Sequence, residues 1–233
     1  MLKRKQSKPA AALCRSQAGF TMPELLLSAL LASTVMAAFY SVYRVQIHTV
    51  KLQENRLDAQ DYARATLDMI VREIRNAAFN PQGAVSGTAL GTGCAGALLP
   101  GAPGVLAADG KTFSFTTDSR GNSVSSPPDG SCDDPDEQMT YVYDTSGCPA
   151  GLGNITRNGE SLTDCNVKSF DLRYFRQDGT EIARPVTAVD LPNIQRVLVA
   201  VTIESLNGDA QFGGPMVATM TSNADLRNRG LSS

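Results

Sequence analysis

One carboxylate, Glu24, stands at the start of an apolar segment that is long enough to cross a membrane. Counted from Phe20 to Tyr43, the segment has 24 residues, and none from Leu25 to Tyr43 is charged. About 20 apolar residues cross a bilayer as a helix. Charged side chains are costly inside a bilayer, and those found there usually serve a function. The chemistry open to Glu24 is therefore ion pairing with a cation in a medium of low dielectric constant.

The residues around Glu24 also permit a purely local role. Thr21-Met22-Pro23-Glu24 fits the T-x-x-E pattern of a capping box, in which Thr21 caps a helix and Glu24 accepts a hydrogen bond from the Thr21 amide. Proline is tolerated in the first turn of a helix, and an acid there is favoured by the helix dipole. Capping explains where the helix starts, but not why a basic leader and an uninterrupted apolar run accompany it.

The charges of the chain are unevenly distributed. The first 19 residues contain five basic residues and no acid, whereas the remainder contains 16 basic and 23 acidic residues. Basic residues beside an apolar span stay on the cytoplasmic side. An acidic body argues against a nucleic-acid partner, which requires clustered Lys and Arg. A secretory signal peptide cut near Ala37-Ala38 and an uncut anchor both fit the segment. A lipoprotein does not, because Cys14 precedes the apolar run.

Catalytic and metal-binding patterns are weak. The only histidine, His48, lies close to the apolar segment, so the C-terminal part offers no Ser-His-Asp or Cys-His arrangement. We therefore expect no enzymatic activity and no cofactor. An acidic stretch from Asp129 to Glu137 could hold calcium, which prefers several oxygen ligands, although it departs from the EF-hand pattern and also fits a solvated loop. The candidate ligands are Asp129, Asp133, Asp134 and Asp136.

The elements that position these residues can be read from the hydrophobic pattern. Residues 44–79 predict an amphipathic continuation of the helix, with apolar residues from Leu67 to Ala78 at helical spacing and Asn80-Pro81 after the last turn. Residues 80–111 are rich in Gly, Ala and Pro and predict a loop. Residues 112–233 predict a β-rich globular domain, with strands at 112–117, 139–144, 167–175, 196–205 and 216–222, and a short strand after the turn at 177–180. One long helix followed by strands predicts an α+β fold, in which an antiparallel sheet covers the second half of the helix.

The segment "GFTMPELL" resembles the class III signal of type IV pilins and type II secretion pseudopilins, G-F-T-x-x-E followed by an apolar helix. The resemblance implies that residues 1–19 are a leader, cut after Gly19 by a membrane prepilin peptidase, and that Phe20 becomes the N-methylated first residue. It also implies that Glu24 pairs with the N-terminal amine of a neighbouring subunit. Pro23 stands where the family more often has Leu or Ile.

The C-terminal half resembles minor pilins and pseudopilins of the PilW and GspJ kinds. The matching features are the Asp178-Gly179 hairpin, the strand that begins near Arg196 and the closing Leu226-Arg227-Asn228. The resemblance implies a pilin-like fold and partners of three kinds: prepilin peptidase, other pilin or pseudopilin subunits, and an inner-membrane assembly platform. It places residues 20–43 in the inner membrane or a filament core and the globular domain in the periplasm.

Cleavage after Gly19 would remove Cys14 and leave an even set of cysteines. An oxidising periplasm favours disulfides in such a set. Four cysteines allow three connectivities, and proximity in the sequence favours Cys94–Cys132 with Cys148–Cys165. Zinc is the rival, but no C-x-x-C motif is present.

Three functions follow from these observations. The first is a minor pilin that assembles into, or primes, a type IV pilus. The second is a minor pseudopilin of a type II secretion system, with nearly the same sequence features. The third is a membrane-anchored ligand-binding domain in which Glu24 belongs only to a capping box.

Overall fold

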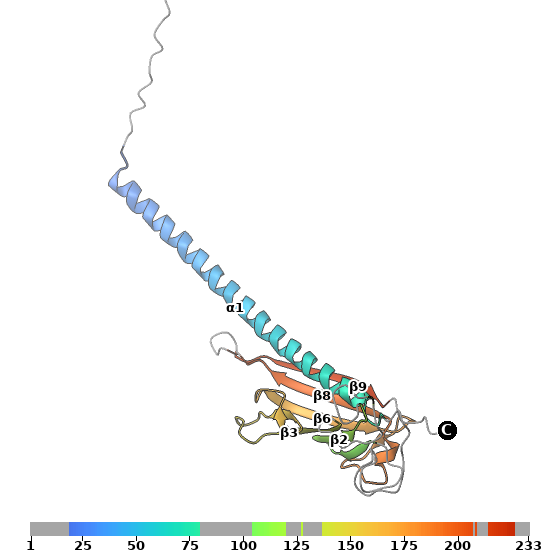
Figure 1. Cartoon of the computed structure of the whole chain (residues 1–233). Coiled ribbons are helices and arrows are strands. Elements are labelled where there is room, and N and C mark those ends of the chain that lie inside the picture. Colours follow the sequence, from blue (N-terminus) through green and yellow to red (C-terminus); the bar gives the residue numbers. More distant parts are fainter. Residues whose placement is uncertain are drawn as a thin grey trace, which may run out of the picture. The chain divides into compact units, whose positions relative to one another are not determined.

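The computed structural model describes residues 19–79, 104–119, 127, 137–206, 208 and 214–226 (Figure 1). The chain divides into two compact units, residues 1–49 and 50–233. Most of the leader, most of the predicted loop at 80–111, Cys94, Cys132 and the four candidate calcium ligands lie outside the described residues.

A single long helix, α1, runs from Met22 to Arg75 and belongs to both units. In the second unit its buried residues recur every three or four positions, so that one stripe faces the core. The stripe begins with Asn55, Ala59 and Ala63 and continues through Thr66, Leu67, Ile70, Val71 and Ile74. This confirms the apolar stripe predicted from Leu67 onward.

The helix ends four residues earlier than the predicted Phe79, because the backbone leaves it to meet a strand. Ala78 has a φ of 63°, and its amide donates to the Thr116 carbonyl at 2.9 Å. The Asp118 amide donates to the Phe79 carbonyl at 2.7 Å. Gly104 lies so close that a Cβ atom added there would fall 2.3 Å from the Ala78 Cα, and its own φ is 81°. Only glycine fits that position without displacing the turn.

The strands form two antiparallel sheets. The first has the order β1-β2-β3-β4-β5 and the second the order β7-β6-β8-β9. The strands are β1 (Val105–Ala108), β2 (Thr112–Thr116), β3 (Gln138–Asp144), β4 (Asn154–Arg157), β5 (Glu160–Ser161), β6 (Val167–Phe175), β7 (Glu181–Ile182), β8 (Arg196–Glu204) and β9 (Val217–Asp225), with a 3₁₀ turn, η1, at Leu191–Asn193. A bridge between Gly153 and Val167 joins the two sheets.

The second sheet shows why its strands are easy to recognise from sequence. In β8, Val197, Val199, Val201 and Ile203 are buried and alternate with less buried neighbours. In β6, Val167 and Phe170 are both buried although they are three residues apart. The register of β6 against β8 shifts between Val167 and Ser169, and this irregularity moves Val167 back to the core face.

Three strands lie where the sequence analysis predicts none. β1 falls inside the predicted loop at 80–111 and pairs with β2 across the turn at Asp109-Gly110, and β4 and β5 form a hairpin through Asn158-Gly159. Each of these strands has four residues or fewer, too short for an alternating pattern to stand out. Their Asp-Gly and Asn-Gly turn residues are the signals that could have revealed them.

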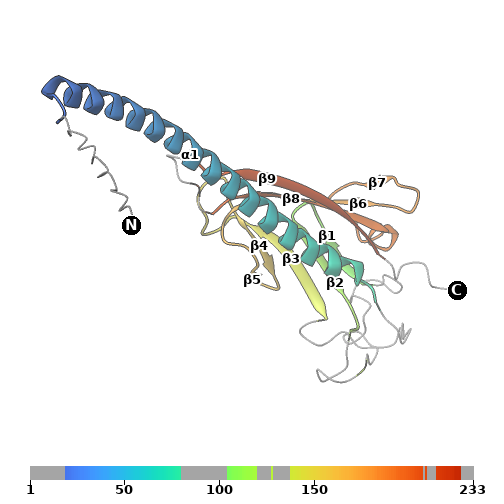
Figure 2. The same cartoon turned by 90° about the horizontal axis from the view of Figure 1, so that it is seen from above.

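The hydrophobic core lies between α1 and the two sheets, which confirms the α+β prediction. Figure 2 shows the second half of α1 passing over strands of both sheets. Four fully buried aromatic residues fill the centre, and the rings of Phe113 in β2 and Tyr174 in β6 connect the sheets with their centroids 5.7 Å apart.

A polar cluster fixes α1 to the first sheet. The Glu73 carboxylate accepts a hydrogen bond from the Tyr141 hydroxyl in β3 and another from Arg157 Nε in β4, at 3.0 Å. Burial of the phenol and its bond to Glu73 raise the pKa of Tyr141 well above its ordinary value. Tyr141 therefore remains a neutral donor, and the cluster pairs a partly buried carboxylate with two donors.

Replacing Tyr141 by Phe removes one donor and keeps the buried ring. We expect the free energy of unfolding to fall by about 1.5–3 kcal/mol, the range for a hydrogen bond to a charged group. Urea unfolding of the full chain in detergent micelles, followed by circular dichroism, measures the change. Tyr40→Phe removes an exposed hydroxyl from the first unit and should leave the midpoint unchanged. Equal urea midpoints for Tyr141→Phe and the parent would show that the hydrogen bond from Tyr141 to Glu73 does not stabilise the fold.

Candidate functional site

The residues before and within the first turn of α1 lie on an exposed chain end. Gly19 and Phe20 precede the helix, and the Phe20 side chain is 80% exposed. Pro23 is the second residue of α1 and therefore removes no hydrogen bond of the helix. The Leu25 amide donates to the Thr21 carbonyl at 3.1 Å, which closes the first turn. The predicted cleavage site thus lies outside the helix, at exposed residues that a protease can reach.

Glu24 is exposed in the first turn of α1. Among the described residues, neither side-chain bond of the capping box is formed, and no ion pair involves Glu24. The helix dipole favours an acid at this position, but it does not neutralise a full charge. The carboxylate is therefore available to a cation outside the described chain.

Among the described residues, the apolar side chains from Leu25 to Tyr43 have no packing partner that buries them. Large residues from Leu25 to Tyr43 are more than half exposed, and an 18-residue window of α1 meets the length and composition of a membrane span with none of it buried. Such an exposed apolar face requires a bilayer or other protein surfaces. The first half of α1 is a candidate membrane-spanning helix.

The serine and threonine hydroxyls of this segment already form hydrogen bonds within the helix. Each Ser or Thr between Glu24 and Val50 donates to a backbone carbonyl three or four residues earlier in the helix. The donors are Ser28, Ser33, Thr34, Ser41 and Thr49, at 2.8–2.9 Å. An unpaired hydroxyl in an apolar medium is costly, so these local bonds lower the cost of removing the Ser and Thr side chains from water.

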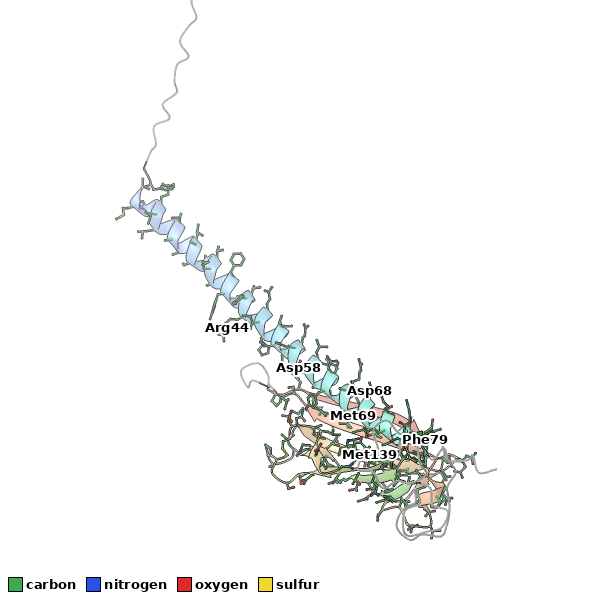
Figure 3. All side chains as sticks on the ribbon, viewed as in Figure 1. Arg44, Asp58, Asp68, Met69, Phe79 and Met139 are labelled. Carbon is green, nitrogen blue, oxygen red and sulfur yellow. A yellow bond between two sulfur atoms is a disulfide. The ribbon has the colours of Figure 1, made fainter. Side chains whose placement is uncertain are left out.

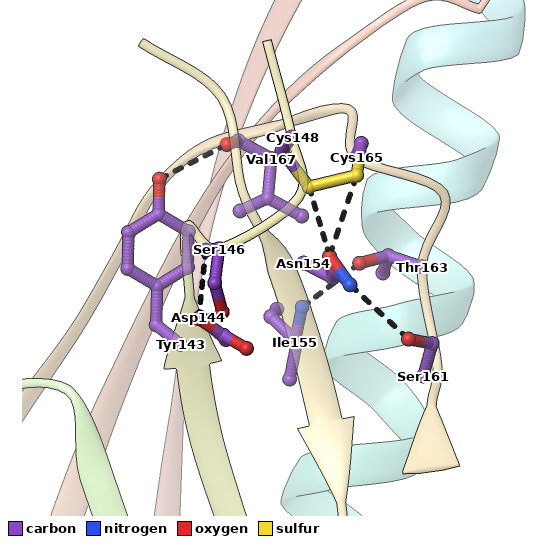
Figure 4. Close-up of a disulfide and its surroundings, with 10 residues drawn as sticks. All are labelled: Tyr143, Asp144, Ser146, Cys148, Asn154, Ile155, Ser161, Thr163, Cys165 and Val167. Atoms are coloured by element: carbon purple, nitrogen blue, oxygen red, sulfur yellow. Dashed lines mark hydrogen bonds between the residues drawn. A yellow bond between two sulfur atoms is a disulfide. The ribbon is translucent and has the colours of Figure 1, made fainter. Parts of the chain in front are cut away.

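In the globular unit, Cys148 and Cys165 form a disulfide with a Cα–Cα distance of 5.3 Å, as predicted (Figure 4). Asn154, the first residue of β4, lies against the bridge. Its Oδ1 is 3.3 Å from the Cys148 sulfur, and its Nδ2 donates to Ser161 Oγ at 3.1 Å. The bridge therefore ties the segment before β4 to the segment before β6, next to the junction between the sheets.

The remaining predicted site residues lie outside the part of the chain that the structure describes, apart from His48. Cys94 and Cys132, with Asp129, Asp133, Asp134 and Asp136, lie outside the described residues. Within the described ranges, no group of three or more His, Cys, Asp or Glu side chains could hold a metal ion. His48 lies on α1, far along the sequence from the disulfide.

Two interactions of the globular unit were not predicted from the sequence. One is the Glu73–Tyr141–Arg157 cluster, whose members are 68 and 84 residues apart, and the other is the contact of Asn154 with the disulfide. No sequence signal points to either one, because the first depends on how distant elements meet and the second on the path of the chain between the two cysteines.

No family model matches the chain, and neither a curated protein nor a solved structure matches it.

Removing the disulfide by the double substitution Cys148→Ser and Cys165→Ser should lower the free energy of unfolding. The two residues are 17 apart, and closing a loop of that length contributes roughly 3 kcal/mol in the chain-entropy model. Urea unfolding of the full chain measures the loss, with Cys14→Ser as the control that removes a cysteine outside the globular unit.

Peptide mapping without reduction checks the pairing itself. We expect one cross-linked peptide pair containing Cys148 and Cys165 in protein isolated from membranes. Free, alkylated thiols at both positions would contradict the bridge.

Proposed function

We propose that this chain is a minor pilin, which is processed between Gly19 and Phe20 and assembles through α1 into a type IV pilus filament. The observation that carries the proposal is the exposed Glu24 carboxylate at the start of a helix that is free of charge from Leu25 to Tyr43. The resemblance of Gly19–Leu26 to the class III signal supplies the processing step.

Ion pairing gives Glu24 its proposed role. When apolar helices pack together, an unpaired carboxylate among them is strongly destabilising unless a cation neutralises it. Cleavage after Gly19 creates an ammonium group on Phe20. The Phe20 ammonium of a neighbouring copy can reach Glu24 when the two helices are offset along their axes. Buried ion pairs are better attested as determinants of register than as sources of stability.

The exposed apolar face of α1 supports the two environments that the proposal requires. Before assembly, the segment from Leu25 to Tyr43 would cross the inner membrane, with the basic leader on the cytoplasmic side. After extraction, the same face would pack against other helices. Because the hydroxyls bond within the helix, neither environment has to provide partners for them.

The disulfide of the globular unit supports a periplasmic location, since disulfides persist mainly in oxidising compartments. A pseudopilin of a type II secretion system would use the same helix and the same carboxylate. Deletion of the gene separates the two: loss of surface pili and twitching favours the pilin, and loss of protein export favours the pseudopilin.

The processing step can be tested by intact mass and N-terminal sequencing of protein extracted from membranes. We expect the chain to begin at a methylated Phe20. Gly19→Lys should block cleavage and leave residues 1–19 attached, whereas Gln17→Lys, two residues away, should be processed. An intact leader in the parent protein, or a start beyond Ala38, would contradict the proposal.

The role of Glu24 can be tested by Glu24→Gln, which removes the charge and retains a side chain that a capping box accepts. We expect the variant to enter the membrane and be cleaved, but to be at least tenfold depleted from sheared filaments on immunoblots. Glu54→Gln changes an acid of α1 outside the apolar segment and should be incorporated normally. Normal incorporation of Glu24→Gln would show that assembly does not need the charge of Glu24.

A further inference from the structure

A groove of about 400 Å³ lies beside the second half of α1, within the globular unit. Its walls come from α1, from the residue before β6 and from the end of β8. The residues that matter for its chemistry are Asp58, Asp61 and Tyr62 on the helix and Asn166 and Glu204 on the sheet side. Figure 3 shows Asp58 on α1, and Asp68 further along the helix.

The groove is acidic. Asp58 and Asp61 are exposed on α1, and within the described part of the chain neither forms an ion pair or a hydrogen bond. Glu204 is already paired, since its carboxylate lies 2.7 Å from Lys168 Nζ. Two carboxylates on one helix turn therefore line the groove with no cation in contact among the described residues, although Lys51, which is bonded to Glu54, attracts Asp58 through space.

Asn166 gives an independent indication of a ligand. Its side chain is 3% exposed, and in the described part of the chain neither its amide nitrogen nor its amide oxygen has a hydrogen-bond partner. Only its backbone is engaged, because its carbonyl accepts from the Glu204 amide at 2.8 Å. Buried amides in folded proteins are almost always paired. A ligand that satisfies Asn166 must offer both a donor and an acceptor.

We propose that this groove binds an arginine side chain carried by a partner polypeptide. A guanidinium has five donors in a planar arrangement that suits carboxylates, so it can bond Asp58 and Asp61 and donate to Asn166 Oδ1. The backbone carbonyl of the same segment can accept from Asn166 Nδ2. Tyr62, whose hydroxyl is held 3.3 Å from Asp164, adds an aromatic wall on which a guanidinium can stack.

The other classes of ligand fit less well. The described residues contain no group of three metal-ligating side chains, so the groove is not a metal site of that kind. Phosphate and carboxylate ligands would be repelled by the two free aspartates. An apolar side chain would leave both aspartates and Asn166 unpaired. This inference does not depend on the proposed assembly through Glu24.

The test uses the full chain in detergent micelles with two probes, the peptide acetyl-Gly-Arg-Gly-amide and its citrulline counterpart. Citrulline has nearly the same shape and no charge. We expect the arginine peptide to shift the Asn166 side-chain amide signal in ¹⁵N spectra in a saturable way, with a dissociation constant at least tenfold lower than that of the citrulline peptide. Equal shifts from both peptides, or none up to millimolar concentration, would overturn the proposal.

Substitutions of the aspartates test whether the arginine peptide binds in this groove. The double substitution Asp58→Asn and Asp61→Asn should weaken binding of the arginine peptide at least tenfold. Asp68→Asn, an exposed acid on the same helix outside the groove, should leave it unchanged. Circular dichroism and the unfolding midpoint verify that each variant is folded. Unchanged affinity in a folded Asp58/Asp61 variant would rule out this groove as the binding site.

Discussion

Burial of one helix stripe between two antiparallel sheets is the interaction on which the globular unit depends. Ala59 and Ala63 begin the buried stripe with small side chains, which let the helix approach the strands closely, and Ile70 and Ile74 fill the centre of the core. Neither sheet could bury its inner face without this stripe, since an antiparallel sheet needs a covering layer. The same helix leaves every residue from Met22 to Gln46 exposed. One element therefore provides both the core of the folded unit and the surface that needs a membrane or a neighbouring protein.

Polar contacts then fix the helix at one position on the sheets. Apolar packing alone would allow small shifts along the stripe. The Glu73 carboxylate removes that freedom, because it must reach Tyr141 and Arg157 together, and Arg75 adds a bond to the Asn223 carbonyl of β9 at 3.3 Å. These contacts involve both sheets. The partly buried Glu73 carboxylate fixes the position of the helix on the sheet, since its two donors lie on different strands.

The sequence predicts those elements whose apolar residues follow a repeating pattern. The helix, the long strands β6 and β8 and the stripe from Leu67 follow from spacing alone, and the disulfide follows from proximity of Cys148 and Cys165. The short strands β1, β4 and β5 were missed because pairing with neighbours, rather than their own pattern, makes them strands. The division into two sheets was also missed, since it depends on where Gly153 meets Val167. Asn166 could not have been singled out, because nothing in a sequence reports that an amide lacks a partner.

The close contact between Ala78 and Gly104 brings together two points of the chain that are distant in the sequence. The Gly104 carbonyl accepts from the Thr116 amide of β2, and the Phe79 carbonyl accepts from the amide of Asp118, just after that strand. A segment whose two ends lie close together can change in length at small entropic cost, because the entropy of loop closure depends only logarithmically on the number of residues. The chain between Phe79 and Gly104 joins two points that are held close together, so we expect a change in its length to cost little stability.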